Sequence, residues 1–177
     1  MSDNSYIGQG MDAVLGRDFL TWLWFRSEIE NKFSTDKGEE FSVFMEQRIV
    51  VQGGEGDTVE TASVSGVLSE LREARMGLTT GKKVTRALVR FEQDPESWQL
   101  TLKAEDFSIG SLKTPKVEGA VEKDDDPEAV FFEKVYLLEK GLDFLNTVYK
   151  AFLKLRLSDT WTGELTDLRK WLYPANN

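Results

Sequence analysis

An apolar stripe of helical period runs along the C-terminal part of the chain and constrains the fold more than any other feature. Its members alternate steps of four and three residues: Phe131, Val135, Leu138, Leu142, Leu145, Tyr149 and Phe152. This spacing predicts one face of an α-helix over 128–157. Further apolar residues widen the stripe at Leu137, Phe144, Val148 and Leu155. A stripe this wide favours a helix that packs on a domain core, and a dimer contact is the alternative.

The residues just before this stripe predict where the helix begins. Pro127 suits the first helical turn, and Asp126 suits the capping position ahead of it. The neighbouring aspartates stand where the helix dipole favours negative charge. We interpret this acidic cluster as a cap rather than a calcium or magnesium site, because it lacks the spaced ligands and the glycine of a calcium loop.

A second helix is expected near the N-terminus, with a heavy aromatic load. Residues 1–16 contain several glycines and predict a flexible N-terminal segment, followed by a single α+β domain over 17–177. A helix over 17–33 places most of its apolar side chains on one inward face: Phe19, Trp22, Leu23, Ile29 and Phe33. Leu20 and Trp24 fall off that face, so we expect a second layer or a partner chain to cover them. Arg26 and Glu30 are spaced for an ion pair.

The residue pattern in the middle of the chain predicts β-strands. β-Branched and aromatic residues predict strands at 41–52, 58–66, 81–93, 98–106 and 109–118. In 98–106, apolar and polar residues alternate, which indicates one buried face and one wet face. Short helices are expected over 67–76 and 163–172. The element order predicts an α+β fold, in which an antiparallel sheet of about four to six strands packs with the N-terminal aromatic helix and the long C-terminal helix.

The chain contains no histidine and no cysteine. Their absence excludes serine and cysteine nucleophiles activated by histidine, imidazole or thiolate zinc sites, and disulfides. The sequence also lacks a P-loop, a dinucleotide-binding glycine motif and an HExxH motif. We therefore expect no enzymatic activity, no metal and no cofactor. Metal-dependent hydrolysis by carboxylates is the catalytic alternative that remains.

The charge balance is acidic, with 22 basic and 31 acidic residues and a formal net charge of −9. Such a surface is repelled by phosphate backbones. No run of about 18 apolar residues and no secretory signal are present, so we expect a cytoplasmic protein without membrane association.

A modest basic island interrupts this acidity. Residues 75–116 contain eight basic and five acidic residues. If 82–91 is a strand, Arg86 and Arg90 share a face with Val84 and Leu88, and Lys83 lies on the other face. The candidate contacts to DNA phosphates are Lys82, Lys83, Arg86, Arg90 and Lys113. The alternative is a half-exposed strand whose charges keep it soluble and discourage edge pairing.

Two stretches, "GKKVTRALVRF" and "WQLTLKAEDFSIGSLK", resemble the C-terminal part of the recombination-associated protein RdgC family. The resemblance is clearest over residues 81–113. The matching positions are Gly81, Lys82, Val84, Thr85, Arg86 and Leu88, then Asp106, Ser108, Ile109, Leu112 and Lys113. It implies a bacterial, non-enzymatic protein that binds double-stranded DNA without strong sequence preference, forms a ring-shaped dimer and restrains recombinase-driven strand exchange. This chain is shorter than that family pattern and more acidic.

Two functions follow as expectations. The first is an RdgC-like protein associated with recombination, with double-stranded DNA or recombination proteins as partners. The second is an acidic protein-interaction or oligomeric scaffold module without DNA binding. For the second, the candidate partner contacts are Leu20 and Trp24, and a homo-oligomer is one form that it takes.

Overall fold

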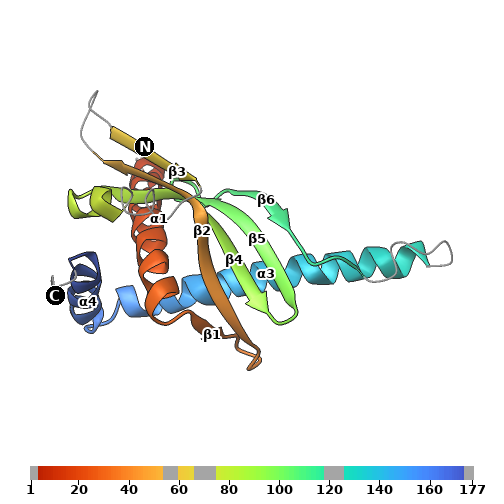
Figure 1. The fold of residues 1–177 in the computed structure, drawn as a ribbon. Coiled ribbons are helices and arrows are strands. Elements are labelled where there is room, and N and C mark those ends of the chain that lie inside the picture. The colour runs from red at the N-terminus through yellow and green to blue at the C-terminus, as the bar shows by residue number, and fades with distance from the viewer. Residues whose placement is uncertain (1–3, 54–59, 66–74, 118–125, 174–177) are drawn as a thin grey trace.

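The computed structural model describes residues 4–53, 60–65, 75–117 and 126–173 and has an α+β fold (Figure 1). The helices are α1 (Asn4–Ile29), α3 (Pro127–Arg156) and α4 (Trp161–Leu172). The strands are β1 (Lys32–Ser34), β2 (Glu40–Gly53), β3 (Glu60–Ser65), β4 (Lys83–Gln93), β5 (Glu96–Lys103) and β6 (Ile109–Lys113). The predicted fold class is confirmed, and the six-stranded sheet meets the upper end of the expected range. The short helix expected over 67–76 falls largely outside the described residues.

All strand pairs are antiparallel, and the strand order is β1–β2–β4–β5–β6. The long strand β2 pairs with β1 near its beginning and with β3 near its end, while β4 runs along its other side. At the far side, β6 pairs with β5, and no described strand lies beyond it. Among the described strands, β6 is therefore an edge strand, and we call its unpaired side the free edge of the sheet.

The predicted alternation of β5 is confirmed. Trp98, Leu100 and Leu102 are fully buried beneath the helices, and the residues between them face the other side of the sheet. In β4 the predicted faces are wrong at one position. Val84 is buried with Ala87 instead of sharing the outer face of Arg86. The cause is a register irregularity between β2 and β4 at this point, which changes the two-residue period by one.

Helix α1 begins at Asn4 and ends at Ile29, which corrects two expectations. Residues 4–16 are helical rather than a flexible segment, and Phe33 lies in β1 rather than on the inward helix face. Ile29, also assigned to that face, is 56% exposed at the helix end. The predicted ion pair between Arg26 and Glu30 is confirmed, with 3.0 Å between its charged atoms. A buried hydroxyl fixes α1 on the sheet, because Thr21 accepts a hydrogen bond from the Val84 backbone N–H at 3.1 Å.

Leu20 and Trp24 are buried inside this chain, with 0% and 2% of their surface exposed. Trp171 of α4 covers Trp24 edge-on, with ring centroids 5.5 Å apart. The proposed role of Leu20 and Trp24 as partner contacts is therefore corrected, since the C-terminal helix supplies the second layer that covers Trp24.

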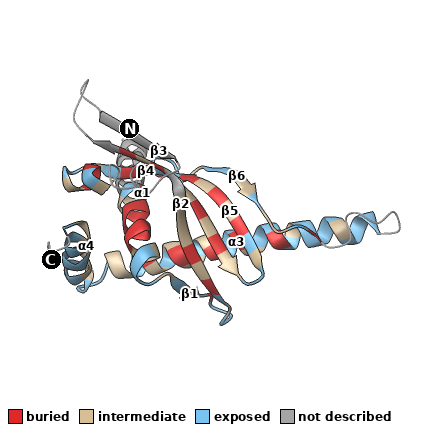
Figure 2. Cartoon of the chain, viewed as in Figure 1, coloured by how far each residue is buried: buried red, intermediate tan, exposed pale blue. Residues whose placement is uncertain are grey.

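Helix α3 begins as predicted. The Asp126 side chain accepts a hydrogen bond from the Glu128 backbone N–H at 3.1 Å, and Pro127 occupies the first turn. The helix lies along the sheet, where Phe144 stacks on Phe41 at 4.2 Å between ring centroids. Figure 2 shows that buried residues concentrate on α1, on the strands and on the part of α3 that crosses the sheet. Beyond the sheet, α3 continues with a mostly exposed surface (Figures 1 and 2).

None of the described helices combines the length and the apolar character that a membrane span requires.

Candidate functional site

One face of the sheet carries part of the predicted basic site. We call the face of β2, β4, β5 and β6 that is turned away from the helices the open face. Its side chains form rows across the strands: Phe44, Arg90, Gln99 and Lys113 in one row, and Val50, Arg86 and Lys103 in another. The structure thus places three of the five predicted DNA contacts, Arg86, Arg90 and Lys113, on one face.

Lys82 and Lys83 lie elsewhere. The Lys83 ammonium group forms an ion pair with Asp18 of α1 at 2.7 Å, so its charge is partly balanced within the chain. Lys82 precedes β4, and its backbone N–H donates to the Gly77 carbonyl at 3.1 Å. These two lysines therefore do not extend the row of basic groups on the open face.

Arg90 is also balanced within the chain. Its guanidinium contacts the carboxylates of Glu46 and Glu92 and lies over the Phe44 ring, 4.3 Å from the ring centroid. A guanidinium with two carboxylate partners and a stacked ring has little free charge to offer a phosphate.

Arg86 and Lys103 are exposed and stand directly opposite each other on β4 and β5. Like charges in this position repel one another, and a bound anion would relieve that repulsion. The turn after β5 brings Asp106 near Lys103. The pKa of Asp106 lies below its usual value, because Ser108 donates hydrogen bonds to the carboxylate and Lys103 adds a favourable charge.

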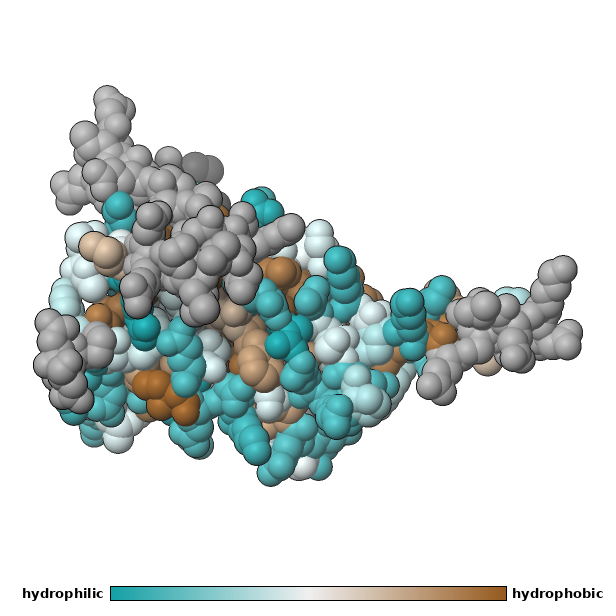
Figure 3. Space-filling view, viewed as in Figure 1, coloured by the Kyte–Doolittle hydropathy of each residue, from teal (hydrophilic) through white to brown (hydrophobic). Residues whose placement is uncertain are grey.

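A different surface stands out by its exposed apolar side chains. We call residues 127–142 the projecting half of α3. Its five large hydrophobic residues with substantial exposure are Phe131 (61%), Phe132 (60%), Tyr136 (56%), Leu138 (42%) and Leu142 (38%). In the space-filling view, apolar and polar side chains mix along this projection (Figure 3).

The charges around these side chains are mainly acidic. Glu128, Glu133 and Glu139 are exposed. Of the two lysines in the projecting half, Lys140 turns back toward the sheet, where its ammonium group lies 5.7 Å from the Trp98 ring centroid. Lys134 remains exposed.

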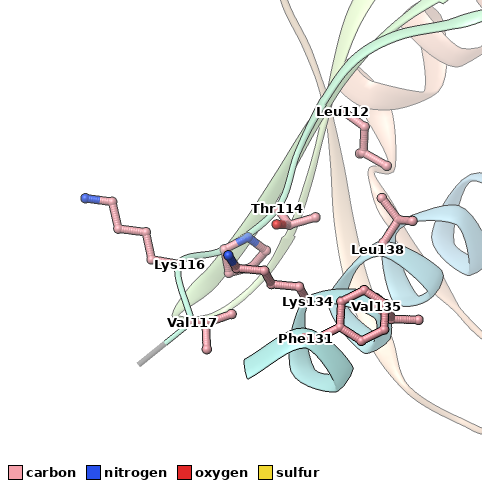
Figure 4. Close-up of a pocket in the computed structure, with 9 residues that line it drawn as sticks. Leu112, Thr114, Lys116, Val117, Phe131, Lys134, Val135 and Leu138 are labelled. Atoms are coloured by element: carbon pink, nitrogen blue, oxygen red, sulfur yellow. The ribbon is translucent and has the colours of Figure 1, made fainter. Parts of the chain in front are cut away.

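A groove of about 580 Å³ lies between the projecting half and the chain that leaves β6 (Figure 4). Its floor is apolar, with Leu112 and Val117 on one side and Phe131, Val135 and Leu138 of α3 on the other. Lys116 and Lys134 also line it. A second hollow of about 590 Å³ adjoins it across Thr114–Lys116, where Glu96 and Glu133 give it a more polar lining.

The described residues hold no group of three or more acidic side chains arranged to bind a metal ion. The carboxylate alternative therefore has no candidate metal centre among the described residues.

Comparisons of the chain with protein-family models, with curated proteins and with solved structures found no significant match. The resemblance to the RdgC family over residues 81–113 therefore remains a prediction.

Sequence reasoning missed the projecting half as a site, because it assigned the whole apolar stripe of α3 to one surface. One signal was available. Phe132 and Tyr136 are large aromatic residues that fall outside the four-and-three stripe, so a single packed face would leave them uncovered. The groove had no sequence signal, since it depends on where residues 114–117 cross α3.

Proposed function

We propose that this chain is a non-enzymatic protein-interaction module, and that the projecting half of α3 is its contact surface. The observation that carries this proposal is the cluster of exposed aromatic residues Phe131, Phe132 and Tyr136, each more than half exposed. Single exposed apolar residues are ordinary on protein surfaces, whereas clusters of them mark interaction sites. Aromatic side chains are enriched in interfaces because they bury a large area at a low entropic cost.

The position of the cluster supports the same function. The exposed side chains lie on a helix that is anchored in the core at its other half, through Phe144, Val148 and Phe152. A contact surface on a rigid element loses little conformational entropy when it binds.

Site-specific photo-crosslinking in cells tests this function. A benzophenone amino acid replaces Phe132 or Tyr136, and the matched control carries it at Leu157, which is 83% exposed at the other end of α3. We expect discrete protein adducts at Phe132 and Tyr136 that the control does not form. If the adducts at all three positions are the same, the projecting half has no specific partner and the proposal is wrong.

We propose RdgC-like binding to double-stranded DNA as the second candidate function. The specific observation in its favour is the pair Arg86 and Lys103, which places like charges opposite each other on the open face. A bound phosphate would relieve their repulsion. The ion pairs of Lys83 and Arg90 argue against a larger basic surface.

Fluorescence anisotropy with a labelled DNA duplex at low salt tests this second function. We expect binding that weakens steeply with salt, and a loss of affinity in the R86E/K103E variant. The control is K170E, which changes a charge on α4, away from the open face. Absence of binding by the wild-type chain at low salt, or equal effects of the variant and the control, would refute DNA contact at this face.

A further inference from the structure

The groove beside the projecting half lies at the free edge of the sheet. β6 pairs with β5 on one side only, and no described strand pairs with its other side. Helix α3 continues past this edge (Figure 1). The exposed backbone of an edge strand is a template for another strand, which would lie about 4.8 Å from β6.

The floor of the groove matches the side chains that such a strand would present. In a strand, alternate side chains point to the same face, so every second residue would face the helix layer. At this place the helix layer consists of Phe131, Val135 and Leu138, and Figure 4 shows them side by side on α3. Leu112 of β6 supplies the neighbouring apolar contact within the sheet. An added strand would thus cover apolar side chains that are now exposed.

The lysines of the groove define the charge of its occupant. Lys116 and Lys134 are both exposed, and they lie on opposite walls of the groove. They are the two charged residues among those that line this groove, and the acidic residues Glu96 and Glu133 line the adjoining hollow instead, so the groove itself favours an acidic ligand.

We propose that the groove binds an extended segment of a partner protein, with apolar side chains at alternate positions and acidic side chains between them, which pairs with β6 as an additional strand. This inference rests on the proposed interaction function and specifies the chemistry of the partner. Main-chain hydrogen bonds to β6 supply affinity, and the apolar floor with the two lysines supplies specificity.

A second copy of this chain fits the groove less well. The β6 segment of another copy, Ile109–Lys113, carries no acidic residue and therefore offers no partner for Lys116 and Lys134. An acidic segment pairs with both lysines.

The test uses short fluorescein-labelled peptides that alternate valine with glutamate, measured by fluorescence anisotropy with the full chain. One control peptide carries lysine in place of glutamate. Another carries N-methyl groups along one edge of its backbone, which prevents strand pairing on that edge; a companion peptide carries them along the opposite edge. The glutamate peptide gains two exposed ion pairs where the lysine peptide meets two like charges, so we expect it to bind roughly tenfold more tightly.

Protein variants provide the decisive comparison. In K116E/K134E the preference should reverse, so that the lysine peptide binds more tightly, while K170E leaves the preference unchanged. V135D, which places a charge on the apolar floor, should weaken both peptides. One of the two N-methylated peptides should lose binding and the other should keep it.

Three results would overturn the inference. The first is equal binding of the glutamate and lysine peptides, and the second is unchanged binding of both N-methylated peptides. The third is self-association in sedimentation velocity that K116E/K134E abolishes, because it assigns the groove to a second copy. Adducts at Phe132 in the crosslinking experiment do not depend on these peptides. Failure of the peptide test together with specific adducts would therefore reject the strand-addition model and leave the interaction function in place.

Discussion

The Gly16→Ala substitution tests the packing of α1 against the sheet most directly. A Cβ atom at this position would lie 1.9 Å from the carbonyl oxygen of Ala104 and 2.7 Å from its carbonyl carbon. Both atoms belong to the backbone, so no side-chain rotation can relieve the overlap. The Ala104 backbone is itself held in place, because its N–H donates to the Thr85 carbonyl at 2.8 Å. The helix or the strand end would have to move by roughly 1.5 Å to reach an ordinary contact distance.

Two opposing effects set the size of the change in stability. Alanine favours a helix over glycine by about 1 kcal/mol, which stabilises the variant. Overpacking of a rigid core costs about 1–3 kcal/mol, and a backbone overlap belongs at the upper end of that range. We therefore expect a net loss of about 2 kcal/mol in the free energy of unfolding. With a urea dependence of about 2 kcal/mol per molar, the unfolding midpoint should fall by about 1 M.

The matched control is Gly163→Ala in α4. Apart from its chain neighbours and the backbone of its own helix, no described atom lies within 4 Å of a Cβ at Gly163, so only the helix preference acts there. That variant should gain up to about 1 kcal/mol in stability. Urea unfolding followed by tryptophan fluorescence measures both. If Gly16→Ala keeps or raises the midpoint, as Gly163→Ala does, then α1 does not pack against Ala104 and the reasoning fails.

Four further substitutions test other parts of the structure. Trp171→Ala uncovers aromatic side chains of α1 and should lower the free energy of unfolding, measured by urea denaturation, by about 2 kcal/mol. An unchanged free energy would show that α4 does not cover α1. Ser108→Ala removes the hydroxyl hydrogen bond that lowers the pKa of Asp106, so an NMR titration should give a higher pKa. In the unaltered chain, the lowered pKa of Asp106 stabilises the folded state at pH values above the ordinary pKa of 3.8, and this stabilisation is lost as the pH falls through the lowered pKa. If the pKa of Asp106 is the same in Ser108→Ala, the hydroxyl does not contact the carboxylate. Phe132 is 60% exposed, so Phe132→Ala should change the free energy of unfolding by less than about 0.5 kcal/mol in urea. Phe144 is fully buried, so Phe144→Ala should lower it by about 3–5 kcal/mol. Similar losses for the two variants would place both side chains in the core.

Periodicity predicted the long elements well, because burial on one side forces a repeat that local sequence records. The stripe over 128–157 corresponds to α3, and the alternation over 98–106 overlaps β5, which runs from Glu96 to Lys103. The exact faces of β4 were less predictable. A single register irregularity between β2 and β4 places Val84 in the core, and such a bulge depends on the partner strand rather than on the sequence of β4 alone.

Contacts between distant residues were the main source of error. Trp24 was treated as surplus because nothing near it in sequence could cover it, yet α4 packs on it from near the C-terminal end. Glycines gave the second error. Three of them predicted a break in residues 1–16, whereas Gly16 is required by the close approach of α1 to Ala104. Glycine thus indicated tight packing here, and only the tertiary structure separates that cause from a turn.

The core interpretation of the α3 stripe applies to only part of the helix, and the alternative, a dimer contact, stays a prediction for the exposed part. A helix of 30 residues is about 45 Å long. Five strands side by side, as in the order β1–β2–β4–β5–β6, span only about 24 Å. The sheet therefore covers roughly half of the helix, and the remaining apolar side chains have no cover from it. The stripe continues unchanged across this boundary, so its sequence cannot show where the cover ends. An additional strand at β6 would extend the sheet over the next part of the helix, which is why the free edge and the exposed stripe are best explained by one binding event.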